Sequence, residues 1–155
     1  MGANDMSPCE LAQWMRSEYE AMKQLSKLLR QHIATMPDTV TDEWLRGLQA
    51  AFERLYVHLD KAYRMKSEGG YLNMVTESRP SLSPQVEELY SEQQQILELG
   101  GQILGELKKV DPRRKLLLGD VCARVGRFMD LVDEHDHREV MLTQVVCSLD
   151  LGTKD

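Results

Sequence analysis

Two polar side chains interrupt an otherwise apolar helical face near the end of the chain. His135 and Glu139 stand four residues apart in the segment 128–146, which is about one turn of an α-helix. A carboxylate on a buried face is costly unless it is paired, hydrogen-bonded or bound to a metal. The pair therefore predicts a polar site inside the core, whose partners the rest of the chain must supply. The face itself recurs at alternating steps of four and three and consists of Val121, Val125, Phe128, Val132, His135, Glu139, Leu142, Val146 and Leu149.

Three earlier segments each carry one polar residue on an apolar helical stripe. These residues are Glu18, His58 and Gln93. Counted from the turns that join the segments, all three lie at a similar height to His135, given a rise of about 1.5 Å per residue. We therefore expect Glu18, His58, Gln93, His135 and Glu139 to form one polar layer inside an apolar bundle.

Four long helices must position this layer. Helical periodicity predicts them from about Cys9 to Thr35, from Thr41 to the glycines at 69–70, from Ser83 to Asp111, and from about Arg113 to Leu149. Residues 69–83 form the longest irregular connection, with short helical content at 71–75. The pattern predicts an all-α, up-down-up-down four-helix bundle over residues 9–149, with a flexible start at 1–8 and a C-terminal tail at 150–155.

Composition narrows the class of protein. The chain has 155 residues, 42% of them hydrophobic and 28% charged, which suits one globular domain. A formal charge of −6 argues against nucleic acid or an anionic membrane as partner. No apolar run approaches the ~20 residues of a membrane span, and the N-terminus shows no secretory signal. Three cysteines without CxxC spacing predict reduced thiols in a cytoplasmic protein.

The predicted layer has two chemical interpretations. Two imidazoles and two carboxylates from facing helices suit a metal ion such as iron, manganese or zinc. Alternatively, the same groups form a hydrogen-bond network in which Gln93 bridges the His and Glu side chains. So large a network costs stability without an obvious structural need, and both interpretations stay open.

Four short motifs carry a resemblance to a known family. They are Phe-Glu-Arg-Leu-Tyr-Val-His-Leu at 52–59, Gly-Tyr-Leu at 70–72, Leu-Tyr-Ser-Glu-Gln at 89–93 and the His-x-x-x-Glu pair at 135–139. With these motifs the chain, over about residues 10–148, resembles the hemerythrin-like (HHE cation-binding) domain family. The resemblance implies a non-haem iron site, usually di-iron, that carries or senses oxygen, stores iron, or responds to nitric oxide and redox state.

The resemblance assigns ligand roles to individual residues. His58, His135 and Glu139 match positions that ligate metal in the family. The first helix offers Glu18-Tyr19 where the family has His. Ala62 stands where the family has a carboxylate, and Gln93 where it has a third-helix His. The resemblance then implies one metal held by His58, His135, Glu139 and Glu18, with Gln93 or water completing the site.

Three functions follow from these residues and motifs. The first is a cytoplasmic protein that binds non-haem iron, mononuclear or dinuclear, and uses it to sense or store iron or to bind O2 or another small diatomic molecule. The second is a metal-free bundle that acts as a regulatory or protein-interaction module, with a protein partner on the 69–83 connection. The third, oxidoreductase chemistry at the metal, would need the open position that Ala62 leaves. No motif of hydrolase or transferase chemistry is present, and no catalytic residue is predicted.

Overall fold

The computed structural model describes residues 6–152, and all regular structure in this range is helical. Of the expected flexible start and tail, residues 1–5 and 153–155 lie outside the described range. The all-α class is confirmed, and the helix bounds agree with the predicted ones to within about one turn. The elements are α1 (Pro8–Ala34), α2 (Asp42–Gly69), α3 (Asn73–Ser78), the 3-10 turn η2 (Pro80–Leu82), α4 (Ser83–Lys109) and α5 (Lys115–Gly152).

Local sequence explains where the helices begin and end. The Ser7 hydroxyl accepts a hydrogen bond from the Glu10 amide at 3.2 Å, and the Thr41 hydroxyl accepts one from the Trp44 amide at 3.1 Å. Both are N-caps that satisfy amides without a helical partner. Gly70 ends α2 with a φ of 64°, the left-handed conformation that glycine adopts without strain.

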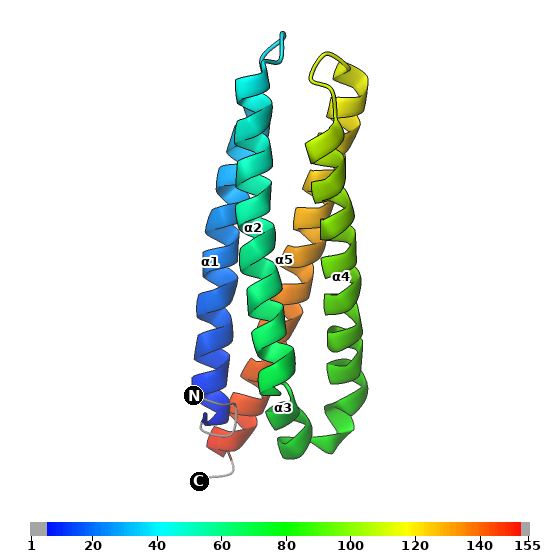
Figure 1. Cartoon of the computed structure of the whole chain (residues 1–155). Coiled ribbons are helices and arrows are strands. Elements are labelled where there is room, and N and C mark those ends of the chain that lie inside the picture. The colour runs from blue at the N-terminus through cyan, green and yellow to red at the C-terminus, as the bar shows by residue number, and fades with distance from the viewer. Residues whose placement is uncertain (1–5, 153–155) are drawn as a thin grey trace.

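The four long helices lie side by side, with α3 at one end of the molecule (Figure 1). The start of α1 and the end of α5 lie at the same end as α3, and the α1–α2 and α4–α5 connections lie at the opposite end. α5 packs against both α1 and α4, and α2 packs against the same two helices. Four helices so arranged enclose a single interior.

The connection between α2 and α4 is more ordered than its sequence suggests. Where an irregular segment with a short helix at 71–75 is expected, α3 and η2 occupy most of the length. Tyr71, Leu72 and Val75 are buried there, and they belong to one hydrophobic cluster with Leu11 and Met15 of α1. The connection therefore closes this end of the interior.

A disulfide joins the start of α1 to the end of α5. It links Cys9 and Cys147, whose Cα atoms are 4.6 Å apart and which lie 138 residues apart in the sequence. The expectation of three reduced thiols is wrong for this pair, while Cys122 is free and buried. Sequence spacing gives no indication of the bond, because only the packing of α1 on α5 brings the two cysteines together.

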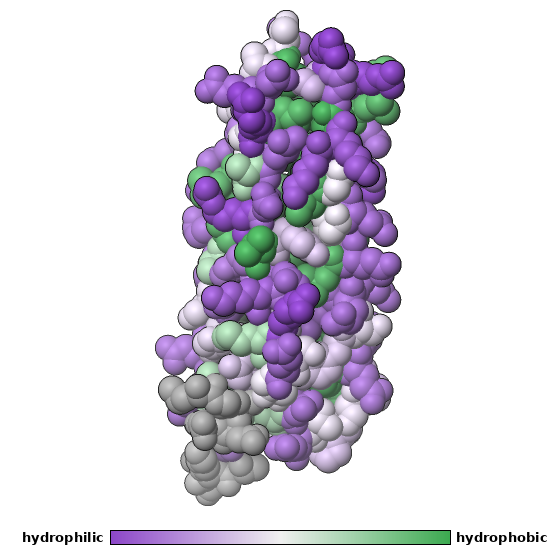
Figure 2. All heavy atoms as spheres, viewed as in Figure 1, coloured by the Kyte–Doolittle hydropathy of each residue, from purple (hydrophilic) through white to green (hydrophobic). Residues whose placement is uncertain are grey.

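The face of the bundle seen in Figure 2 is mainly hydrophilic. On the face seen in Figure 2, hydrophobic residues form separate spots among hydrophilic ones. Among the described residues, no helix combines the length and the apolar character needed to cross a membrane.

Candidate functional site

A cluster of buried polar side chains divides the interior into two hydrophobic parts. On α4, Gln93 lies between Ile96 of one hydrophobic cluster and Leu89 of the other. On α5, the polar segment lies between Val132 and Val140, which belong to different clusters. The buried polar residues are Lys66, Gln93, His135, Asp136, Glu139 and Thr143. We call this set the core polar cluster.

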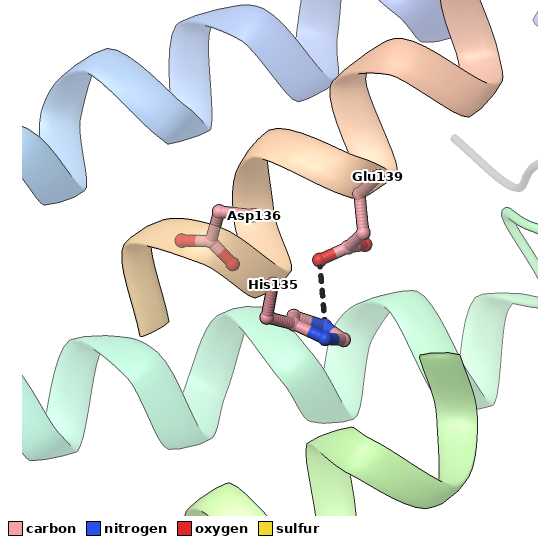
Figure 3. Close-up of side chains that lie close together, drawn as sticks. All are labelled: His135, Asp136 and Glu139. Atoms are coloured by element: carbon pink, nitrogen blue, oxygen red, sulfur yellow. Dashed lines mark ion pairs between the residues drawn. The ribbon is translucent and has the colours of Figure 1, made fainter. Parts of the chain in front are cut away.

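Glu139 lies at the centre of the core polar cluster. Its Oε1 is 3.1 Å from the Lys66 ammonium nitrogen and 3.0 Å from Nε2 of His135. Figure 3 shows the His135 ring and the Glu139 carboxylate facing one another across one turn of α5, with Asp136 projecting from the same turn. Burial would raise the pKa of Glu139, but the positive charge of Lys66 and the contact with His135 hold that pKa below its usual value.

Lys66 is the positive charge that matches Glu139. Burial would lower its pKa, but the charges of Glu139 and Asp136 keep the pKa above the usual value, so the amine is an ammonium. The side chain is only 4% exposed, and its nitrogen lies 5.1 Å above the ring of Tyr63. An ammonium has three hydrogens to donate and no lone pair, so Lys66 serves as a cation here and not as a metal ligand.

His135 lies between two carboxylates. Its Nδ1 is 2.6 Å from Oε1 of Glu92, and its Nε2 is close to Glu139 but is not aligned with it as a hydrogen bond. Burial would lower the pKa of His135, whereas Glu139, Asp136 and Glu92 raise it above the usual value. Because neither neighbouring carboxylate can donate when ionised, the doubly protonated imidazolium fits this position best.

Glu92 connects the cluster to the surface. Its carboxylate pairs with Arg138 as well as with His135, and the Arg138 Nη2 to Glu92 Oε2 distance is 2.5 Å. Partial burial would raise the pKa of Glu92, but Arg138 and His135 hold it below the usual value. The half-exposed Arg138 thus supplies a second positive charge at the edge of the cluster.

Asp136 is a buried carboxyl group with a raised pKa. It is 5% exposed, and its Oδ1 accepts a hydrogen bond from the Tyr63 hydroxyl at 3.0 Å. Burial raises the pKa of Asp136 to about 7, although the charge of Lys66 acts in the opposite direction. Burial and the Asp136 charge in turn raise the pKa of Tyr63 well above its usual value. Asp136 can therefore gain or lose a proton near neutral pH.

The five predicted site residues form two groups. Gln93, His135 and Glu139 belong to the core polar cluster, where the Gln93 amide donates to Glu139 Oε2 at 3.5 Å. His58 and Glu18 form a separate pair, with 3.5 Å between Nε2 and Oε2 and partial exposure of both side chains. The five residues therefore do not form the expected single layer: three are buried in the interior, and two lie at the partly exposed edge of the bundle.

The position of His58 follows from the orientation of α2. The predicted stripe of this helix runs through Trp44, Leu48, Ala51, Leu55, His58, Ala62 and Met65. The buried face is rotated by about one residue and consists of Leu45, Leu48, Phe52, Leu55, Leu59, Tyr63 and Lys66. The rotation moves His58 toward the edge of the bundle and brings Lys66 into the interior.

Whether the cluster fits a metal ion depends on which of its side chains can act as metal ligands. His135, Asp136 and Glu139 offer ligand atoms within 4.8 Å of one another, and within residues 6–152 no other trio of His, Cys, Asp or Glu does so. These three come from one turn of α5, while α2 contributes the Lys66 ammonium and α4 contributes the Gln93 amide and the Glu92 carboxylate, which already pairs with Arg138 and His135. A dinuclear centre needs carboxylates and imidazoles from several helices. The residues present do not fit one.

Lys66, Asp136 and Glu92 are site residues that the sequence pattern does not predict. A signal for Lys66 exists, since the series 48, 52, 55, 59, 63 and 66 also follows helical steps and contains the larger apolar residues of α2. Asp136 directly follows His135, and its burial reflects the wide buried face of a helix that packs against α1, α3 and α4.

Comparison of the chain with protein-family models, with curated proteins and with solved structures finds no match. Fold and site together define an all-helical protein with a buried cluster of paired charges, linked to the surface through Glu92 and Arg138.

Proposed function

We propose that this chain is a hemerythrin-like, up-down-up-down four-helix bundle that works without a metal ion, as a regulatory or protein-interaction module. The order of the helices and the ends at which they are joined support the topology (Figure 1). The motifs around His58, Gln93 and the His135–Glu139 pair support the resemblance. Binding of an iron cofactor is the second candidate function.

The observation that carries this proposal is the Lys66 ammonium, 3.1 Å from Glu139 Oε1. A divalent ion on Glu139 would lie close to this ammonium. At an effective dielectric constant of 20, two unit charges 4 Å apart repel by about 4 kcal/mol, and a divalent ion doubles that figure. Lys66 thus supplies within the fold the positive charge that a metal would otherwise provide.

The charges of the cluster balance without a metal. Lys66 and Arg138 are cations, and Glu139 and Glu92 are their anionic partners. His135 and Asp136 add one further pair, which is neutral overall when the two groups share one proton. Buried charges persist in proteins when they are paired in this way, so the cluster is complete as a network.

An interaction role has support at the surface. Leu131, Met141 and Val145 of α5 are 45%, 52% and 46% exposed, respectively. At 100° per residue these three positions fall within one sector of the helix. Contiguous apolar side chains on one face are typical of surfaces that contact another protein, and Met141 and Val145, one turn apart, are the adjacent pair among these three.

The second candidate is a mononuclear metal on His135, Asp136 and Glu139, used to sense or store iron or to bind O2 or another diatomic molecule. The closeness of their three ligand atoms favours it. This candidate requires Lys66 to lose its proton or to leave Glu139. His58 and Glu18 would remain outside the ligand set, since they form their own pair.

Elemental analysis of the purified, untagged chain after aerobic iron supplementation separates the two candidates. The proposal expects iron far below one atom per chain in the wild type and no oxo-bridge absorption bands. Glu139→Gln should not change the metal content, and Glu87→Gln, an exposed position on α4, serves as its matched control. About one iron per chain in the wild type, lost in Glu139→Gln but kept in Glu87→Gln, would establish the metal site instead.

A further inference from the structure

A cavity of about 490 Å³ lies between α1 and α5. Its floor is apolar and includes Met22, Met129 and Val132, with Leu55 of α2 at the bottom. These four side chains are at most 6% exposed, so the cavity reaches the hydrophobic interior of the bundle. Both the volume and the apolar floor are typical of sites for small molecules.

The acidic groups around the cavity already have partners. Asp130 pairs with Arg30 at 2.6 Å. Asp133 accepts a hydrogen bond from Tyr19, and Asp136 accepts one from the Tyr63 hydroxyl. A hydroxyl does not neutralise a carboxylate, so Asp133 keeps its negative charge at the exposed edge of the cavity, whereas Asp136 is buried.

Two lysines at the same opening lack such partners. Lys23 and Lys27 stand one turn apart on α1, and both line the cavity. Among the described residues neither has an ion-pair partner, although the Lys23 ammonium lies 5.1 Å over the ring of Tyr19. Arg30 and Asp130 pair with each other, so the two lysines face one remaining exposed carboxylate, Asp133, and the opening carries a net positive charge next to an apolar floor.

We propose that this cavity binds an amphipathic monoanion of the aliphatic carboxylate class. The hydrocarbon chain lies on the floor of Met22, Leu55, Met129 and Val132, and the carboxylate pairs with Lys23 and Lys27. A lysine pair suits a head group recognised by charge and not by shape. The inference goes beyond the proposed function and does not depend on it, because Lys23 and Lys27 take no part in the core polar cluster, although Asp136 lines both the cavity and that cluster.

Ligands with one tail and different heads test the inference directly. Decanoate and decyltrimethylammonium, both below their micelle concentrations, are titrated into the full chain by calorimetry. We expect decanoate to bind at least about tenfold more tightly than the cation. Affinity should rise up to about fourfold for each added methylene from hexanoate to decanoate, while the cavity fills.

Matched variants locate the binding. Lys23→Gln/Lys27→Gln should weaken decanoate binding about tenfold or more, whereas Lys61→Gln/Lys109→Gln, two exposed lysines outside the cavity, should leave it unchanged. Ser26→Phe places a ring in the cavity and should abolish binding. Ser26→Leu repeats this test with a smaller side chain, and thermal unfolding confirms that each variant is folded.

Methyl resonances of Met22 and Met129 give an independent readout, since both should shift when decanoate binds. Absence of decanoate binding by the wild type, equal binding of the cation, or full binding by the folded Lys23→Gln/Lys27→Gln variant would each overturn the inference. Iron analysis bears on the core alone, so failure of one proposal does not imply failure of the other.

Discussion

At the scale of single residues, Lys66 determines the chemistry that the core polar cluster can perform. A buried carboxylate such as Glu139 needs a cation, and either a metal ion or an ammonium can meet that need. The two solutions have different consequences. A metal centre adds open coordination positions for small molecules, whereas an ammonium leaves a closed network whose members can only exchange protons and partners.

Replacing Lys66 with Met should destabilise the protein strongly. The change keeps most of the side-chain volume but leaves the buried Glu139 with only His135 and the Gln93 amide as partners, and breaking a buried pair in this way costs about 3–5 kcal/mol. Urea unfolding measures the loss. Lys61→Met, on an exposed position of the same helix, is the control and should change stability by less than about 0.5 kcal/mol.

The double variant Lys66→Met/Glu139→Gln tests whether Lys66 and Glu139 interact directly. Because it removes both charges, it should recover part of the stability that Lys66→Met loses, as expected for residues that interact directly. Equal losses in Lys66→Met and Lys61→Met would show that the ammonium is not what balances Glu139.

Asp136 should make stability depend on pH near neutrality. Its pKa is raised from 3.8 to about 7 in the folded protein, so the folded state holds a proton that the unfolded state releases. The resulting contribution is complete below about pH 4 and is lost as the pH rises through about 7. His135, whose pKa is also raised, acts in the same direction, since its stabilisation too is lost as the pH rises.

Unfolding of the wild type and of Asp136→Asn, compared from about pH 4 to about pH 8, measures this contribution. One pKa unit corresponds to about 1.4 kcal/mol, so the wild type should lose a few kcal/mol relative to the variant across this range. Asp120→Asn, an exposed position on the same helix, should follow the wild type. Parallel curves for the wild type and Asp136→Asn would rule out a proton held by Asp136.

On α4 and α5, the polar residues that interrupt an apolar stripe in the sequence are buried together in the structure. Gln93, His135 and Glu139 stand on such stripes, and all three are buried in one cluster. On α2, two series of residues, offset by one position, both have helical spacing. Only packing against the other helices determines which series is buried, so the sequence pattern alone does not identify the buried face. Lys66 belongs to the series that is buried, but its burial is not expected from the sequence, because a lysine near a helix end is usually exposed.

At the scale of secondary-structure elements, local chemistry explains most of the fold. Ser7, Thr41 and Gly70 mark helix ends in the sequence as they do in the structure. The same local signals could not reveal that α3 and η2 would close one end of the bundle. Burial of Tyr71 and Leu72 requires a surface formed by other helices, Leu11 and Met15 of α1 among them.

The glycines of α4 allow a prediction about helix packing. A Cβ at Gly100 would lie 2.8 Å from the Tyr56 ring and 2.9 Å from Cζ of Phe128, whereas a Cβ at Gly105 would meet nothing within 4 Å. The Tyr56 ring cannot move freely, because its hydroxyl donates to the Leu97 carbonyl at 3.0 Å. Gly100 is therefore the point of close approach between α4 and its neighbours.

Gly100→Ala should lower the free energy of unfolding by about 1–3 kcal/mol, the usual cost of overpacking a core. Gly105→Ala should raise it by up to about 1 kcal/mol, because alanine favours a helix more than glycine does and meets no obstacle there. Chemical denaturation of the two variants on the same helix provides the comparison. Stabilisation by both substitutions would mean that α4 stands further from Tyr56 and Phe128.

At the scale of the whole molecule, the Cys9–Cys147 disulfide ties the first helix to the last. Its two cysteines are separated by 138 residues, so the bond closes a loop that includes almost the entire chain. α1 and α5 also pack along their lengths (Figure 1). The native fold therefore holds the two ends together even without the bond, and the bond acts mainly by restricting the unfolded chain.

Cys9→Ser/Cys147→Ser should keep the native helix content but lose stability. In the chain-entropy model, opening a loop longer than 100 residues costs up to about 5 kcal/mol. Urea unfolding with and without dithiothreitol measures this cost: the reductant should lower the midpoint of the wild type and leave that of the double variant unchanged. A wild-type midpoint that does not respond to reductant would mean that the bond does not constrain the unfolded chain. The slope of the transition adds a second criterion, since an unfolded chain without the crosslink exposes more surface and should give a steeper dependence on urea.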